Sequence, residues 1–216
     1  MRKILLTSSG LTPELSETFL KLIETKPAET KIGFIATASD DDRNPWYVLK
    51  DRTSFEALGF TNIIEVDLKR KDDLAKLDDC HIIFVAGGNT FYLLKWVRES
   101  KFDLKLKELL SLGKMYIGAS AGSMVLGTSI ETASVGAGAD VNKTGIEDLR
   151  GLRQVPFMIA PHIVDADLPA YDAFAKKAAL RPIVGLEDGQ AVLCIGDRYK
   201  LLGPGKPHTW NSKLFR

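Results

Sequence analysis

The sequence has few cysteines, almost no net charge and no long apolar run, and each shortage excludes a class of protein. The two cysteines among the 216 residues, Cys80 and Cys194, lie beside apolar segments, so we expect buried free thiols in a reducing compartment rather than a disulfide. The 29 basic and 28 acidic residues leave a net charge of +1, which gives no support for a nucleic-acid partner.

Signals for membranes, metals and cofactors are also lacking. No apolar stretch approaches the length of a membrane-spanning helix, and the apolar run near Met1 is too short for a signal peptide, so we expect a cytoplasmic protein without membrane contact. The three histidines lack metal-ligand spacing, so no metal site is expected. Residues 8–12 lack the glycine spacing of a dinucleotide-binding turn, so no cofactor is expected either. The sequence leaves the oligomeric state open.

Short apolar segments alternate with longer amphipathic ones over the first 126 residues. Continuous apolar strands separated by helices are typical of a mostly parallel sheet covered on both faces, which is a three-layer α/β fold. In such folds, functional sites form at the carboxyl ends of the strands. The predicted strands are 4–6, 32–36, 63–66, 81–86 and 115–119, and the predicted helices are 13–25, 45–59, 72–77, 90–98 and 104–112.

The pattern changes in the last third of the chain. Residues 131–142 are rich in small side chains and read as a loop or a β-excursion. Asp188-Gly189 is a hairpin signal. We expect this part to extend the sheet with mixed or antiparallel strands, within one domain spanning 1–216. The predicted elements are strands at 155–159, 183–186, 191–194 and 199–202 and a helix at 172–180.

The most specific motif is Gly118-x-Ser120-x-Gly122, which follows an apolar segment. This G-x-S-x-G pattern is typical of a strand-to-helix turn that exposes a serine hydroxyl, known as a nucleophile elbow. The alternative is a plain turn of small residues. The context favours the elbow, because 115–119 reads as a buried strand and 121–126 as the start of a helix.

A serine needs a neighbouring base to take its proton. His162 lies just past the predicted strand 155–159, where it can face the same side as Ser120, so it is the candidate base. His81 begins a strand at the opposite end of the sheet and is predicted to be structural. His208, near the C-terminus, is predicted to be a surface residue.

A second glycine feature, Gly87-Gly88, follows a predicted strand and precedes a helix. The backbone N–H groups of Gly88 and Ala121 are the candidate pair for an oxyanion hole, one from a nearby loop and one from the residue after the nucleophile. Asn89 is a candidate contact to substrate. The alternative is a helix-capping turn with Asn89 or Thr90 as the cap.

Four segments together resemble the peptidase E family of aspartyl dipeptidases, with cyanophycinase as a more distant relative. They are 87–91 (GGNTF), 93–95 (LLK), 118–122 (GASAG) and 161–162 (PH). The resemblance implies a class I glutamine amidotransferase-like fold, which is flavodoxin-like, with serine where the amidotransferases use cysteine. It also implies Ser120 as nucleophile, His162 as base, and Gly88 and Ala121 as oxyanion donors.

The chain departs from the family pattern at the acid that orients the histidine. The family has a carboxylate shortly after the nucleophile, but 132–136 contains no acid. Asp140 is the candidate replacement, and Glu131, Asp165 and Asp167 are further ones. A serine–histidine pair assisted by a carbonyl or a water is also open.

The chain also departs at the segment that reads the substrate. Relatives carry Glu-Thr-Arg after the histidine, suited to an acidic side chain, whereas 165–171 here is acidic and Arg181 is predicted to lie on the surface. A preference for an N-terminal aspartate is therefore not supported. Asp165 and Asp167 would suit an amine or a basic group, or are simply solvated.

These features predict a serine peptidase that hydrolyses short peptides through Ser120 and His162. The alternative is a non-catalytic or regulatory binding protein of the same fold that has lost the orienting acid. That alternative predicts that Ser120 and His162 lie beyond hydrogen-bonding reach of each other.

Overall fold

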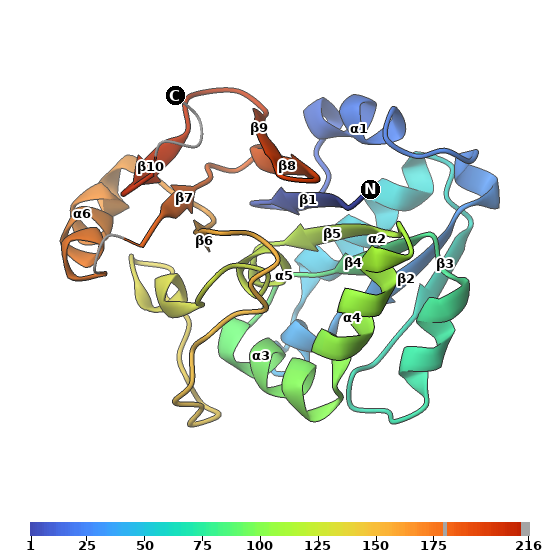
Figure 1. Cartoon of the computed structure of the whole chain (residues 1–216), viewed down its shortest axis with the longest axis horizontal. Helices are drawn as coiled ribbons and strands as arrows, with labels where there is room; N and C mark the ends of the chain where they lie inside the picture. Colours follow the sequence, from blue (N-terminus) through green and yellow to red (C-terminus); the bar gives the residue numbers. More distant parts are fainter. Residues whose placement is uncertain (179–180, 213–216) are drawn as a thin grey trace.

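The computed structural model describes residues 1–178 and 181–212, and its main feature is a seven-stranded sheet with the order β3-β2-β4-β5-β1-β8-β9 (Figure 1). The first five strands in this order are parallel, while β8 and β9 extend the sheet in antiparallel fashion. The prediction of a mostly parallel sheet with later antiparallel strands is therefore confirmed. The strands are β1 (Lys3–Thr7), β2 (Lys31–Ile35), β3 (Asn62–Glu65), β4 (Ile82–Val85), β5 (Met115–Ala119), β8 (Ala191–Ile195) and β9 (Arg198–Leu202).

A second sheet has three strands, β6 (Met158–Ala160), β7 (Ile183–Gly185) and β10 (His208–Trp210). β6 and β7 are parallel, and β10 pairs antiparallel with β7. The sequence predicted that the segments of β6 and β7 extend the main sheet, which is wrong: they pair with each other instead. Figure 1 shows this small sheet and the last helix together at one end of the molecule.

Helices cover the main sheet, and most lie where the sequence predicts them. The first helix ends at Leu20 rather than at 25, and the predicted helix at 72–77 is a 3-10 helix, Asp73–Asp79. Residues 131–142 hold the 3-10 turn Glu131–Ser134 and no strand. The last helix begins earlier than predicted, and positions 179 and 180 of the prediction lie outside the described residues. The helices are α1 (Pro13–Leu20), α2 (Trp46–Ala57), α3 (Thr90–Glu99), α4 (Phe102–Ser111), α5 (Ala121–Met124) and α6 (Leu168–Lys177).

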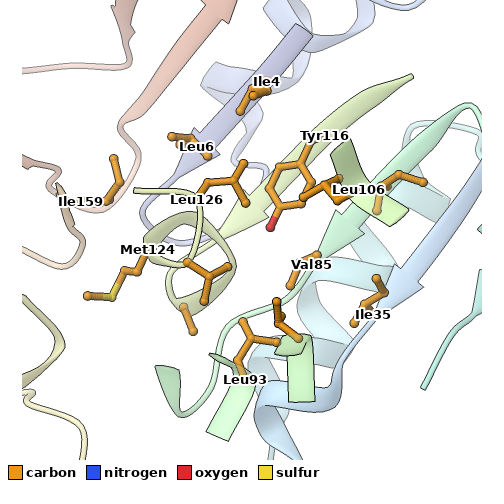
Figure 2. Close-up of a cluster of buried hydrophobic side chains, with 14 of the residues drawn as sticks. Ile4, Leu6, Ile35, Val85, Leu93, Leu106, Tyr116, Met124, Leu126 and Ile159 are labelled. Atoms are coloured by element: carbon orange, nitrogen blue, oxygen red, sulfur yellow. The ribbon is translucent and has the colours of Figure 1, made fainter. Parts of the chain in front are cut away.

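The alternation of side chains along the strands produces one apolar layer on each face of the sheet. On one face, Ile4 and Tyr116 are buried with residues of α3 and α4, including Leu93 and Leu106 (Figure 2). On the other face, Leu5 packs in a cluster that includes side chains of α1 and α2. Helices therefore lie on both faces, which gives the three-layer arrangement predicted from the sequence.

Two expectations about composition can be compared directly with the structure. Cys80 and Cys194 are buried and free, as predicted. Within 1–178 and 181–212, no helix is both long and apolar enough to cross a bilayer.

Candidate active site

Ser120 stands at the sharp turn between β5 and α5, with φ 49° and ψ −111°, a backbone conformation that L-residues rarely adopt. The flanking glycines permit this turn. A Cβ at Gly118 would lie 2.5 Å from the Gly122 carbonyl oxygen, and a Cβ at Gly122 would lie 2.1 Å from the Val85 carbonyl oxygen. The strand-turn-helix context is therefore as predicted, and the helix that begins after Ser120 is short and ends at Met124.

The imidazole of His162 connects Ser120 to a carboxylate. Its Nε2 lies 3.0 Å from Ser120 Oγ, and its Nδ1 lies 2.7 Å from Asp188 Oδ1. The hydrogen bond from His162 holds the pKa of the Asp188 carboxyl below its usual value, although partial burial opposes this. An acid, an imidazole and a hydroxyl in this order are the arrangement of a serine hydrolase.

The parallel pairing of β6 and β7 explains why the acid meets the imidazole. His162 follows β6 and Asp188 follows β7, so both residues leave the same edge of the small sheet. Asp188 is not predicted from the sequence, because the pair Asp188-Gly189 is typical of a hairpin turn. The available signal was an acid just past a predicted strand, but reading it requires knowing that this strand is parallel to the one before His162.

Ser8 is a further residue of the site that the sequence does not predict. It follows β1, and its Oγ donates to Asp188 Oδ1 at 2.9 Å and accepts the backbone N–H of His162 at 2.8 Å. The hydroxyl is fully buried. Ser8 therefore joins the end of the main sheet to both residues that come from the small sheet.

The glycine pair after β4 lies against Ser120. A Cβ at Gly87 would lie 3.2 Å from Ser120 Cβ, and Gly88 has φ +134°, with a Cβ there lying 2.2 Å from the Ala38 carbonyl oxygen. Among the described residues, neither the Gly88 N–H nor the Ala121 N–H donates to a protein acceptor. Gly88 lines the cavity, whereas Ala121 is buried directly behind Ser120.

Asp140, the predicted orienting acid, lines the cavity but does not bond to His162. Its carboxylate accepts the Thr90 N–H at 2.8 Å, at the start of α3, and its own N–H donates to the Ala133 carbonyl. Burial raises its pKa despite these bonds. This corrects the prediction, because the Asp140 carboxylate binds the N-terminus of α3 while Asp188 contacts the imidazole.

The remaining acids named from the sequence lie elsewhere. Asp165 is exposed and does not line the cavity, which corrects its assignment to substrate binding. Asp167 accepts the Ala137 N–H. Glu131 forms an ion pair with Arg181, so neither of them faces His162.

Asn89 is in the cavity wall, and its side chain is already engaged. Its Oδ1 accepts the Tyr92 N–H at 3.0 Å, and its Nδ2 donates to the Val141 carbonyl at 2.9 Å. The helix-cap alternative therefore describes its contacts in the structure. The other histidines lie apart from Ser120: His81 accepts the Lys31 N–H, and His208 pairs with Glu187.

A cavity of about 840 Å³ opens over Ser120, and Ser8, His162 and Asp188 also line it. Its walls come from the carboxyl ends of β1, β4 and β5 and from α2, as expected for a parallel sheet. Within the described ranges, no group of three or more His, Cys, Asp or Glu side chains could hold a metal ion.

Comparisons with known proteins agree with this fold. The model of peptidase family S51 matches residues 4–202. A peptidase E of Shewanella amazonensis is 30% identical over 66% of this chain, and an uncharacterized peptidase of Pasteurella multocida is 32% identical over 75% of this chain and 80% of its own length. The match covers 63% of the Shewanella protein, so the chain spans less than two thirds of that relative.

A solved structure gives the same fold. A candidate peptidase E protein of Listeria monocytogenes superposes with a TM-score of 0.80 over 95% of this chain and all of the other, at 23% identity. The family match spans nearly the whole described chain. The chain belongs to peptidase family S51.

Proposed function

We propose that this protein is a serine-type peptidase that hydrolyses short peptides, with Ser120 as nucleophile, His162 as general base and Asp188 as the orienting acid. The observation that carries the proposal is the continuous series of contacts from Asp188 Oδ1 through the His162 ring to Ser120 Oγ, at 2.7 and 3.0 Å. Membership of a peptidase family supports the same reaction class.

Each residue has a separate role in this mechanism. His162 Nε2 takes the proton of Ser120 as Oγ attacks the peptide carbonyl, and then gives it to the leaving amine. Asp188 keeps the other ring proton on Nδ1 and stabilises the imidazolium that forms. Water then attacks the acyl group on Ser120. His162 takes the proton of that water and returns it to Ser120 Oγ as the carboxylic acid leaves.

Two backbone amides complete the proposed machinery. The N–H groups of Gly88 and Ala121 stabilise the oxyanion of the tetrahedral intermediate, because they have no acceptor within the described part of the protein. One such donor is worth about 3 kcal/mol in the transition state. The strained turn at Ser120 supports this role, because it places Oγ and the following N–H together at the sharp corner between β5 and α5.

The alternative of a non-catalytic binding protein depended on a lost acid and a broken serine–histidine contact. The distance of 3.0 Å between His162 Nε2 and Ser120 Oγ is within hydrogen-bonding reach, and Asp188 supplies an acid. No observation in the described residues favours the binding protein over the peptidase.

The first prediction concerns the nucleophile. Ser120→Ala should abolish hydrolysis of a dipeptide and tripeptide library and prevent labelling by a fluorophosphonate probe, because Ser120 carries the hydroxyl that His162 Nε2 contacts. Ser134→Ala, at an exposed position outside the cavity, is the matched control and should keep both properties. Unchanged hydrolysis by Ser120→Ala would reject the proposed function.

A further inference from the structure

The cavity wall holds the buried carboxyl group of Asp51, for which the structure shows no hydrogen-bond or ion-pair partner within 1–178 and 181–212. Asp51, on α2, is 5% exposed and lines the same cavity as Ser120. Burial raises its pKa to about 7, and the opposing influence is the charge of the adjacent Lys50. An unpaired buried carboxyl with a perturbed pKa in a cleft is typical of a functional group.

The backbone near Asp51 is shaped to admit its carboxylate. A Cβ at Gly10 would lie 1.9 Å from Asp51 Oδ1, so only glycine leaves room for the carboxylate there. Gly10 also has φ +82°, which favours glycine. Gly10 lies two positions after Ser8, whose hydroxyl contacts Asp188 and His162. The short loop after β1 therefore contacts the proposed triad through Ser8 and leaves room for the Asp51 carboxylate at Gly10.

The Asp51 carboxylate has no cationic partner among the described residues, and this indicates the chemistry of a ligand that would bind there. Burying a carboxylate without a partner is unfavourable, and a cationic ligand group is what offsets it most directly. Several other charged side chains line the cavity, but their contacts lie elsewhere. Asp42 accepts from Tyr47, Asp140 accepts from Thr90, and Lys50 donates to the Ser9 carbonyl. The remaining charged groups of the wall, apart from Asp188 and His162, are Asp41, Arg43 and Lys143.

We propose that Asp51 is the subsite for a protonated primary amine, so that the cavity selects short peptides that carry an ammonium group. The group is either the N-terminal amine or a lysine side chain. The consequence for hydrolysis rests on the proposed function, whereas the binding itself does not.

Binding is tested in the Ser120→Ala protein, which holds a peptide without cleaving it. By calorimetry, alanylalanine and N-acetyl-lysyl-alanine test the two sources of an ammonium group, and N-acetyl-alanylalanine has neither. At least one ammonium peptide should bind more tightly than the uncharged one, and adding Asp51→Asn should weaken that binding about 10- to 100-fold. Equal binding with and without Asp51→Asn would overturn the proposal.

Hydrolysis by the protein with Ser120 intact provides the second readout. Asp51→Asn should lower kcat/KM for the preferred ammonium peptide and leave that for N-acetyl-alanylalanine within about two- to threefold. The rate of fluorophosphonate labelling at Ser120 should stay the same, which shows that the site is folded. An equal loss for all three peptides would mean a structural role and would overturn the proposal.

The matched control is Asp165→Asn, which makes the same charge change at an exposed position outside the cavity. It should leave both binding and hydrolysis unchanged. If Asp165→Asn instead of Asp51→Asn removed the preference for an ammonium group, the subsite would not be at Asp51. If no peptide were hydrolysed at all, the proposed function would fail, while the calorimetry would still decide whether Asp51 binds an amine.

Discussion

Asp188 and Asp140 both line the cavity, but only the Asp188 carboxylate contacts the imidazole of His162. Asp140 instead accepts the Thr90 N–H at the start of α3. At the scale of single residues, the role of an acid is therefore decided by which donor its oxygens meet, since both acids are close to the same cavity.

Replacement of each acid by its amide distinguishes the two roles. Asp188→Asn should lower kcat about 10²- to 10⁴-fold, because an amide cannot hold His162 in the tautomer that accepts the Ser120 proton. Asp140→Asn keeps an oxygen for the Thr90 N–H, so its kcat should stay within about threefold of the parent. Steady-state hydrolysis of the best library peptide checks both, and a larger loss in Asp140→Asn would contradict the assignment of Asp188.

At the scale of elements, the turn between β5 and α5 depends on two glycines. A Cβ at Gly122 would lie 2.1 Å from the Val85 carbonyl oxygen, which belongs to the neighbouring strand β4. Backbone atoms on both sides leave little freedom to move away. The strand, the turn and the helix therefore approach each other as closely as glycine allows.

The prediction at this scale compares two glycine-to-alanine changes. Gly122→Ala should destabilise the protein by about 2 kcal/mol or more and lower Ser120 labelling, because the strand and the helix must separate. Gly138→Ala should change the free energy of unfolding by less than about 0.5 kcal/mol, since a Cβ there would meet nothing within 4 Å. Urea unfolding measures both, and equal stabilities would contradict the close contact.

The sequence was sufficient to predict the elements whose formation depends on local patterns of residues. The strands that became β1, β2, β4 and β5, and the serine turn, follow from continuous apolar runs and glycine spacing. The partner of His162 did not follow, because it depends on which strands pair. The segments of β6 and β7 could have joined the main sheet by composition alone, and only their pairing with each other brings Asp188 to His162.

At the scale of the whole molecule, Asp51 makes stability depend on pH. Its pKa is about 7 in the folded protein against 3.8 for the ordinary carboxyl, so the folded state holds a proton that the unfolded chain releases. The free energy of unfolding contributed by this group therefore falls as pH rises from about 4 to about 7 and is level above that.

Asp51→Asn removes this loss. The variant should match the parent near pH 4 and exceed it above pH 7 by an amount on the order of 4 kcal/mol, reduced by any structural relaxation around the charge. Urea unfolding at pH 4.5 and pH 8 checks the difference. Asp165→Asn should show no such divergence. If the difference in free energy of unfolding between the parent and Asp51→Asn were the same at pH 4.5 and pH 8, that result would contradict the raised pKa.

The proposed triad is divided between two sheets, since Ser120 ends β5 of the seven-stranded sheet while His162 and Asp188 follow strands of the three-stranded one. A slide of roughly 1 Å between the sheets would separate Oγ from Nε2 without breaking a single strand ladder. The rate of Ser120 labelling by the fluorophosphonate probe should therefore fall at a lower urea concentration than the far-ultraviolet circular dichroism signal. If the urea midpoints of labelling and circular dichroism coincided, the interface between the two sheets would be as stable as the sheets themselves.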